Sequence, residues 1–143
     1  MCWTSLMLYP AHHICIGIDA EPAKVTQFAG NPANLPQWAA GLSAGIRQEG
    51  VKWITDSPMG VVEVRFTGPK KNDVPEHGIL DHDVILPDGT TVHNPLRVLA
   101  NGTGSEVIFT LHRLPGTSDA DLERDADMVR EDLARLKQLL EQG

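Results

Sequence analysis

A histidine and an asparagine on neighbouring segments are the side chains of this sequence best placed for chemistry. His82 lies in segment 79–86 and Asn94 in segment 91–100, and Pro87-Asp88-Gly89 separates the two segments. If these three residues form a hairpin loop with the glycine in the left-handed conformation, His82 faces Asn94 across two antiparallel strands. The pair could then orient the polar group of a ligand. Alternatively, the two side chains could bond to each other, or face water at an open end of the sheet.

Six histidines raise the question of a metal site, but their spacing argues against one. A zinc site normally needs three or four convergent ligands, and the sequence contains no His-x-x-x-His or Cys-x-x-Cys spacing. The same hairpin register places Asp83 beside His93 and Asp81 near Arg97, all on a polar face. We therefore predict hydrogen-bonded, solvated side chains there, with both carboxylates ionised, and neither a metal nor another cofactor.

Motifs for nucleophilic catalysis and phosphate binding lack the structural context that they need. A Gly-x-Ser-x-Gly spacing occurs at 41–45, but it follows the expected second short helix and not a strand, as a nucleophile elbow requires. The glycines of 101–104 are followed by a strand pattern rather than a helix. Cys15 lies on the face opposite the alternating isoleucines of its strand. The sequence alone therefore identifies no catalytic residue.

Composition limits the kinds of protein and of binding partner that are compatible with the sequence. The 143 residues carry a net charge of −7, with 41% hydrophobic and 22% charged residues, which is ordinary for one globular domain. The acidic balance argues against nucleic-acid binding, and no apolar run approaches the ~20 residues that span a membrane. Two cysteines make no disulfide framework, and residues 1–11 do not resemble a signal peptide. We expect a single cytoplasmic domain over 1–143, with an irregular segment at 1–11.

Hydrophobic periodicity and turn residues divide the chain into one strand, two short helices, further strands and a long helix. The expected strands are 12–19, 46–56 with a bend at Gly50, 61–67, 79–86, 91–100 and 106–114, with a polar loop at 68–76. The expected helices are 23–29, about 34–41, and 117–143.

The last helix carries one apolar stripe, which must pack on something. Its members recur at steps of four and three: Leu122, Ala126, Val129, Leu133, Leu136 and Leu140. Met128, Ala134 and Leu139 widen this stripe, and Ser118 is a good N-cap. We expect the stripe to pack on the chain's own sheet; a homodimer seam is the alternative, so the protein is a monomer or a homodimer.

Two turns give the sheet a consistent register. The loop at 87–89 pairs Val84 with Val92 and Leu80 with Leu96. A four-residue loop at 101–104 pairs Val98 with Val107, Leu96 with Phe109, and Asn94 with Leu111. Across the turn at 57–60, Trp53 faces Val64 and Val51 faces Phe66. These pairs form one apolar face, as a buried sheet requires, and an antiparallel sheet covered by one long helix is an α+β architecture.

The order of elements and one local pattern resemble the START/Bet v 1-like (SRPBCC) superfamily, in particular its polyketide cyclase/dehydrase-like proteins. The pattern is the strand and helix start Ile16-Gly17-Ile18-Asp19-Ala20-Glu21-Pro22-Ala23-Lys24-Val25, followed by Asn31-Pro32-Ala33-Asn34-Leu35-Pro36-Gln37-Trp38. Glu21 departs from the family's usual Ala-Pro. The resemblance implies a helix-grip fold, in which a curved antiparallel sheet wraps around the long C-terminal helix and two short helices follow the first strand.

The resemblance also implies an elongated apolar cavity between sheet and helix. The candidate ligand-binding residues are Trp53, Phe66, His82, Asn94, Phe109, Leu111, Arg113 and Met128. We expect a small hydrophobic molecule, lipid- or polyketide-like, to bind there. The alternatives are a polyketide cyclase, aromatase or dehydratase with His82 as general acid or base, or an interaction module that uses the long helix.

Overall fold

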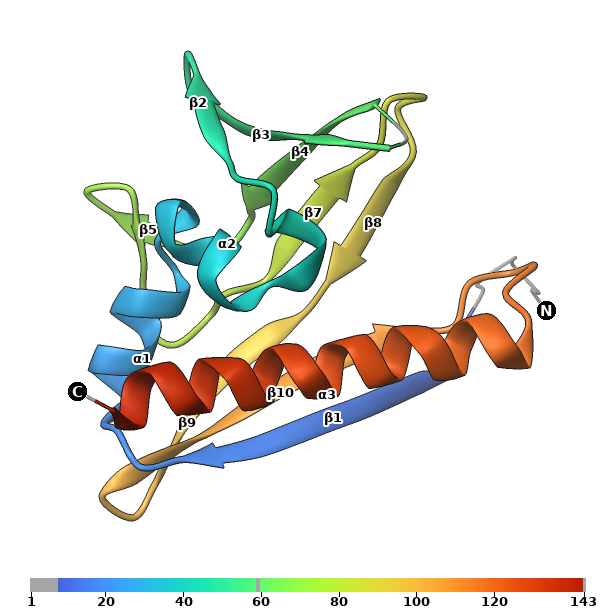
Figure 1. Cartoon of the computed structure of the whole chain (residues 1–143). Coiled ribbons are helices and arrows are strands. Elements are labelled where there is room, and N and C mark those ends of the chain that lie inside the picture. The colour runs from blue at the N-terminus through green and yellow to red at the C-terminus, as the bar shows by residue number, and fades with distance from the viewer. Residues whose placement is uncertain (1–7, 59, 143) are drawn as a thin grey trace, which may run out of the picture.

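The computed structural model describes residues 8–58 and 60–142 (Figure 1). The helical elements are α1 (Pro22–Ala29), η1 (Pro32–Asn34), α2 (Leu35–Trp38), η2 (Ala40–Leu42) and α3 (Asp119–Glu141). The strands are β1 (Ala11–Ile18), β2 (Arg47–Glu49), β3 (Lys52–Ser57), β4 (Gly60–Phe66), β5 (Lys70–Lys71), β6 (Val74–Pro75), β7 (His82–Ile85), β8 (Thr91–Asn94), β9 (Leu96–Asn101) and β10 (Gly104–His112).

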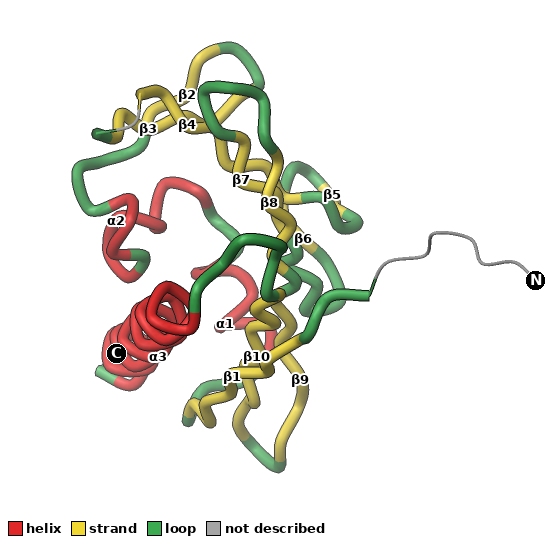
Figure 2. The backbone as a smooth tube through the Cα atoms, turned by 90° about the vertical axis from the view of Figure 1, so that its right-hand side faces the viewer, coloured by secondary structure: helices red, strands yellow, loops and turns green. Residues whose placement is uncertain are grey.

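The main strands form one bent antiparallel wall. Hydrogen bonds order them as β1-β10-β9 and as β2-β3-β4-β7-β8. Pro95 separates β8 from β9, because proline has no N–H to donate to a ladder. The two parts are nevertheless joined, since Leu80 N–H donates to the Leu96 carbonyl and Val98 N–H donates to the Gly78 carbonyl, both at 2.8 Å. Figure 2 shows the strands as a curved wall, with the helices on one side of it.

Most of the expected register is confirmed. The structure pairs His82 with Asn94, Val84 with Val92, Val98 with Val107, Leu96 with Phe109, and Trp53 with Val64. The turns decide these pairs locally, and a slip of one residue would turn apolar side chains outward. Among the described residues, the β9–β10 ladder ends at Leu96 and Phe109, so the expected Asn94–Leu111 pair is not part of it.

Segment 46–56 differs from the expected single strand. It forms a hairpin of β2 and β3, in which Glu49 pairs with Lys52 and Gly50 adopts a φ of 62°. A left-handed glycine allows such a tight two-residue turn. Val51 therefore lies at the hairpin tip with 93% of its surface exposed. The prediction that Val51 faces inward, opposite Phe66, was wrong.

Two further segments are more structured than expected. The loop at 68–76 contains the small hairpin of β5 and β6, whose turn residues Asn72 and Asp73 both have positive φ, as a type I′ turn requires. The second helical segment is divided into η1, α2 and η2, and the Asn31 side chain caps η1 by accepting from Ala33 N–H at 3.1 Å. Leu35 and Trp38 are buried there, as expected.

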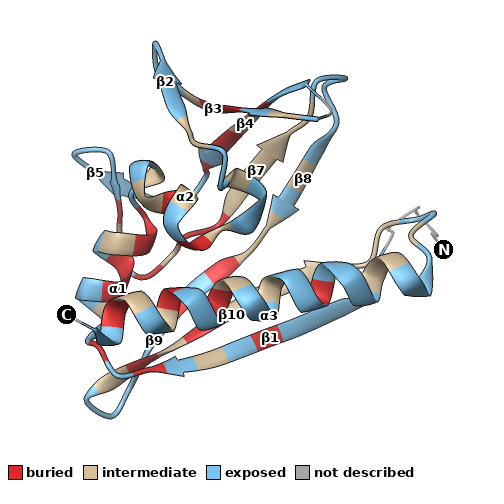
Figure 3. Cartoon of the chain, viewed as in Figure 1, coloured by how far each residue is buried: buried red, intermediate tan, exposed pale blue. Residues whose placement is uncertain are grey.

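Helix α3 packs its apolar stripe against the concave face of the sheet. Ser118 caps it by accepting from Asp121 N–H at 3.1 Å, and the buried positions are Ala126, Leu133, Leu136 and Leu140. Ala134 is exposed, so its assignment to the apolar stripe was wrong. Figure 3 shows buried positions at intervals along α3, which crosses in front of β1 and β10. Among the described residues, no helix has the length and hydropathy of a membrane-spanning segment.

Candidate functional site

A largely apolar cavity of about 480 Å³ lies between the curved sheet, the α2–η2 segment and α3. The strands contribute Val64, Phe66, His82, Val84, Val92, Asn94, Leu96, Phe109 and Leu111 to its lining. The helical segments contribute Leu35, Trp38, Ala39, Gly41, Leu42, Asp125, Met128, Val129 and Asp132. The volume is typical of a small-molecule site, in which apolar walls surround a few polar groups.

His82 is the polar group whose orientation is best defined. Its Nδ1–H donates to the Leu80 carbonyl at 3.0 Å. Its ring stands edge-on between the rings of Phe66 and Phe109, with centroid distances of 5.9 and 6.3 Å. Burial lowers the pKa of His82 below its usual 6.5. The imidazole is therefore neutral, with its proton on Nδ1 and a hydrogen-bond acceptor at Nε2.

Asn94 lies opposite His82 on the neighbouring strand and lines the same cavity. Within residues 8–58 and 60–142, no hydrogen bond joins the two side chains, and the Asn94 amide bonds to no other described residue. The alternative that the two side chains bond to each other is therefore not what the structure shows. Two polar groups, an imidazole acceptor and an amide, line an otherwise mostly apolar wall.

An ion pair between a buried carboxylate and a half-exposed guanidinium holds the bend of the sheet beside His82, on the convex face. The Asp81 carboxylate accepts from Leu96 N–H at 3.0 Å and from Arg97 Nε and Nη2 at 2.8 and 2.7 Å. Both donor residues directly follow Pro95, where the ladder is interrupted. The Arg97 guanidinium lowers the pKa of Asp81, so the expected ionised state of this carboxylate is confirmed.

The polar cluster predicted on the convex face is present. His93 Nδ1 lies 2.7 Å from Asp83 Oδ1, on exposed surface. Among the described residues, no group of three or more histidine, cysteine, aspartate or glutamate side chains is arranged to hold a metal ion.

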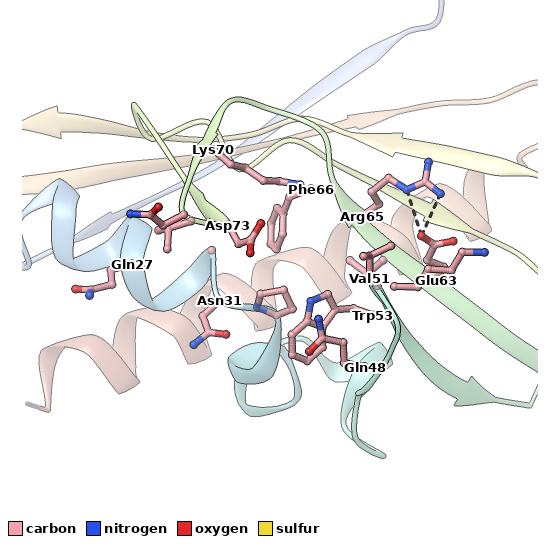
Figure 4. A pocket seen from close by; sticks show the side chains of 16 residues that line it. Gln27, Asn31, Gln48, Val51, Trp53, Glu63, Arg65, Phe66, Lys70 and Asp73 are labelled. Atoms are coloured by element: carbon pink, nitrogen blue, oxygen red, sulfur yellow. Dashed lines mark hydrogen bonds and ion pairs between the residues drawn. The ribbon is translucent and has the colours of Figure 1, made fainter.

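The residues proposed from the sequence occupy three different places. Six of them line the cavity: Phe66, His82, Asn94, Phe109, Leu111 and Met128. Trp53 instead lines a second pocket, shown in Figure 4. Arg113 is outside the cavity lining, because its guanidinium pairs with Asp119 at 2.7 Å and donates to the Thr117 carbonyl at 2.9 Å.

On the helical side of the cavity, Met128 was the one lining residue proposed from the sequence. Asp132 is the most informative omission, since its Oδ1 accepts from Ala40 N–H at 3.1 Å and joins α3 to η2. Burial raises the pKa of Asp132. Its place three residues after Val129, beside the apolar stripe, was the signal that could have found it. Trp38 also belongs to this wall, and its buried indole N–H has no hydrogen-bond partner among the described residues.

A bent antiparallel sheet, a cavity on its concave side and one long helix across that side together define the architecture. The chain has the START/Bet v 1-like helix-grip fold. It is similar to a START superfamily protein from Mycobacterium smegmatis, with a TM-score of 0.65, 13% identity, and coverage of 92% of this chain and 97% of the other. It is also similar to Ara h 8.0201, a Bet v 1 allergen, with a TM-score of 0.64, 11% identity, and coverage of 94% and 99%.

A third similar structure is that of DynU16, a protein in the dynemicin biosynthetic locus. Its TM-score is 0.65 at 14% identity, and the match covers 92% of this chain and 47% of DynU16. Neither a protein-family model nor a curated protein sequence matches the chain. At these identities the likeness establishes the fold, and the fold alone does not fix the chemistry.

Proposed function

We propose that the protein binds a small, largely apolar molecule, lipid- or polyketide-like in chemistry, in the cavity between the sheet and α3. The observation that carries the proposal is the cavity itself: about 480 Å³, lined mostly by apolar side chains, with one oriented imidazole in its wall. Burial of the ligand's apolar surface would supply the main binding free energy. The Nε2 atom of His82 would accept a hydrogen bond from a ligand hydroxyl or amide group.

The electrostatics of His82 favour a neutral ligand group at that position. Its Nδ1 is already bonded to Leu80, and its lowered pKa keeps the ring uncharged. An anionic group facing it would meet no cation, because the charged residues of the cavity lining are Asp125 and Asp132, and burying an unpaired charge is costly. We therefore expect a hydrogen-bond donor without a formal charge to lie against Nε2, next to the rings of Phe66 and Phe109.

Native mass spectrometry of the purified protein, followed by organic extraction, tests this function directly. We expect a copurifying small molecule that a denaturing step releases. His82→Ala should weaken rebinding of the extracted molecule at least about fivefold. The matched control is His93→Ala, since His93 lies on the convex face against Asp83 and should leave binding unchanged. Equal losses in both variants would contradict a ligand at His82.

The second candidate is an enzyme, a cyclase, aromatase or dehydratase acting on a polyketide-like substrate. The specific observation in its favour is the neutral imidazole with an acceptor nitrogen at the cavity wall, which suits a general base. Asn94 would polarise a substrate carbonyl. Turnover that is lost in His82→Ala and kept in His93→Ala would support catalysis, whereas ligand binding without turnover would support a carrier.

An interaction module built on α3 has less support. The apolar stripe of the helix is already covered by the chain's own sheet, with Leu133 and Leu136 1% and 0% exposed. A dimer would have to use the charged outer side of the helix instead. Light scattering across a range of protein concentrations distinguishes a monomer from a homodimer.

A further inference from the structure

A second pocket, of about 790 Å³, lies beside the apolar cavity and shares the lining residues Val64 and Phe66 with it. We call this second pocket the polar compartment. The polar compartment is walled by the end of α1, the β2–β3 hairpin, β4 and the β5–β6 hairpin (Figure 4). Its polar lining residues are Gln27, Asn31, Gln48, Lys52, Glu63, Arg65, Lys70, Asn72 and Asp73.

The two compartments share one wall. Val64 and Phe66 line both of them, and Phe66 is 7% exposed. On the cavity side, the Phe66 ring stands against His82. On the other side, the Lys70 side chain runs across the polar compartment toward Phe66 (Figure 4). Val64 and Phe66 thus lie between the apolar cavity and the polar compartment.

Lys70 and Asp73 are the charged side chains that the β5–β6 hairpin adds to the lining of the polar compartment. The strands add Lys52, Glu63 and Arg65. Glu63 and Arg65 alternate with the inward-facing Val64 and Phe66, so their side chains lie on the convex face, where Arg65 is opposite Asp83. Arg65 is paired with Glu63 at 3.1 Å. Within the described residues, neither Lys52 nor Lys70 has an ion-pair partner.

We propose that the ligand is an amphipathic carboxylate, whose apolar part lies in the cavity and whose carboxylate lies in the polar compartment beside Lys70. This inference rests on the proposed function. A carboxylate inside the apolar cavity would lose its hydration without gaining a cation, whereas one beside Lys70 stays hydrated and gains an attractive charge. The ligand passes the shared wall when the Phe66 ring turns aside, and its uncharged end, which carries the hydrogen-bond donor of the proposed function, lies against His82.

Two probes of equal chain length and different charge test the inference. Decanoate and 1-decanol are titrated against the protein loaded with Nile red, a neutral fluorescent dye, and displacement is measured. We expect Lys70→Met to weaken the binding of decanoate at least about threefold, the size expected for one exposed ion pair. The affinity for 1-decanol should not change. Added salt should reduce the affinity for decanoate only.

Neighbouring residues provide the controls. Lys71→Met removes a charge from the same strand but from a residue outside the pocket lining, so decanoate affinity should change less than twofold. Asp73→Asn removes the opposing carboxylate and should strengthen decanoate binding, and asparagine tolerates the positive φ of this turn. Circular dichroism checks that each variant is folded.

The outcomes separate the inference from the proposed function. If both probes bind and Lys70→Met weakens them equally or not at all, the apolar cavity is a binding site and the carboxylate inference is wrong. If neither probe displaces Nile red, the inference is wrong for linear carboxylates. If Nile red itself does not bind either, the proposed function loses its support as well.

Discussion

Asp132 on α3 accepts a hydrogen bond from the backbone N–H of Ala40 at 3.1 Å, and so links the long helix to η2 across the rim of the cavity. A second link runs beside it, since Arg135 Nε donates to the Gln37 carbonyl at 3.3 Å. These two bonds hold the short helices over the cavity. Burial raises the pKa of Asp132, because the ionised carboxylate loses hydration there.

Asp132→Asn should raise the melting temperature slightly at neutral pH. The amide oxygen can still accept from Ala40, and the partly desolvated charge is removed. Folding raises the pKa of the Asp132 carboxyl above its unfolded value of 3.8. Its contribution to stability is therefore complete below pH 3.8 and is lost as the pH rises through the folded pKa. Thermal melts across pH should therefore show the variant's advantage shrinking toward pH 3.8, and an advantage that is constant with pH would contradict this account.

His82 should titrate with a pKa below its usual value of 6.5, and the neutral ring should carry its proton on Nδ1. Because folding lowers this pKa, the contribution of His82 to stability is complete above 6.5 and falls as pH drops below that value. Nitrogen chemical shifts from NMR identify the tautomer, and a pH titration gives the pKa. A ring that is mainly protonated on Nε2, or a pKa above 6.5, would refute the proposed acceptor.

Leu133→Asp should unfold the protein. Leu133 is 1% exposed in the seam between α3 and the sheet, and an unpaired carboxylate there should cost more than about 3 kcal/mol. The neighbouring Ala134→Asp places the same charge on the exposed side of the helix and should cost less than about 1 kcal/mol. Urea unfolding of both variants measures the difference, and similar midpoints would mean that α3 is not packed as described.

Arg97→Leu should lower the free energy of unfolding by about 1–3 kcal/mol, because it leaves the buried Asp81 carboxylate without its bidentate partner. Since Arg97 lowers the pKa of Asp81, the wild-type protein should lose this contribution as pH falls below 3.8, through the folded value. Chemical denaturation at several pH values tests both statements. A variant as stable as the wild type would show that the ion pair does not support the bend at Pro95.

Asn94→Leu should change ligand affinity more than His93→Leu, by at least about fivefold. The two positions are adjacent on β8, but Asn94 lines the cavity and His93 faces Asp83 on the convex side. Arg97 is a poorer control for binding, because its replacement should also affect stability. Titration of the copurifying molecule measures both affinities, and equal effects would contradict a ligand group at Asn94.

The sequence was most informative where structure is decided by neighbouring residues. The turn at 87–89 sets the register that places His82 opposite Asn94, because turn geometry fixes which residues of a hairpin meet. The same local reasoning failed at Gly50, where a bend was expected and a tight hairpin turn formed. A glycine allows both, and the choice depends on the pairing of β2 with β3.

Apart from Met128, the helical wall of the cavity was not predicted from the sequence. Arg113 shares the inward parity of Phe109, yet it pairs with Asp119 at the start of α3. Trp53 faces inward as expected, but it lines the polar compartment and not the apolar cavity. Strand parity states which face a side chain is on, and it does not state which distant segment covers that face.

By itself, then, the sequence determined most of the strands, their central register and the buried stripe of α3, since periodicity and turn chemistry act over a few residues. Only the tertiary structure decided which inward-facing residues line the cavity and which line the polar compartment, and that Asp132 lines the first and Lys70 the second. Contacts of that kind join segments far apart in the chain, and they depend on packing that no local pattern specifies.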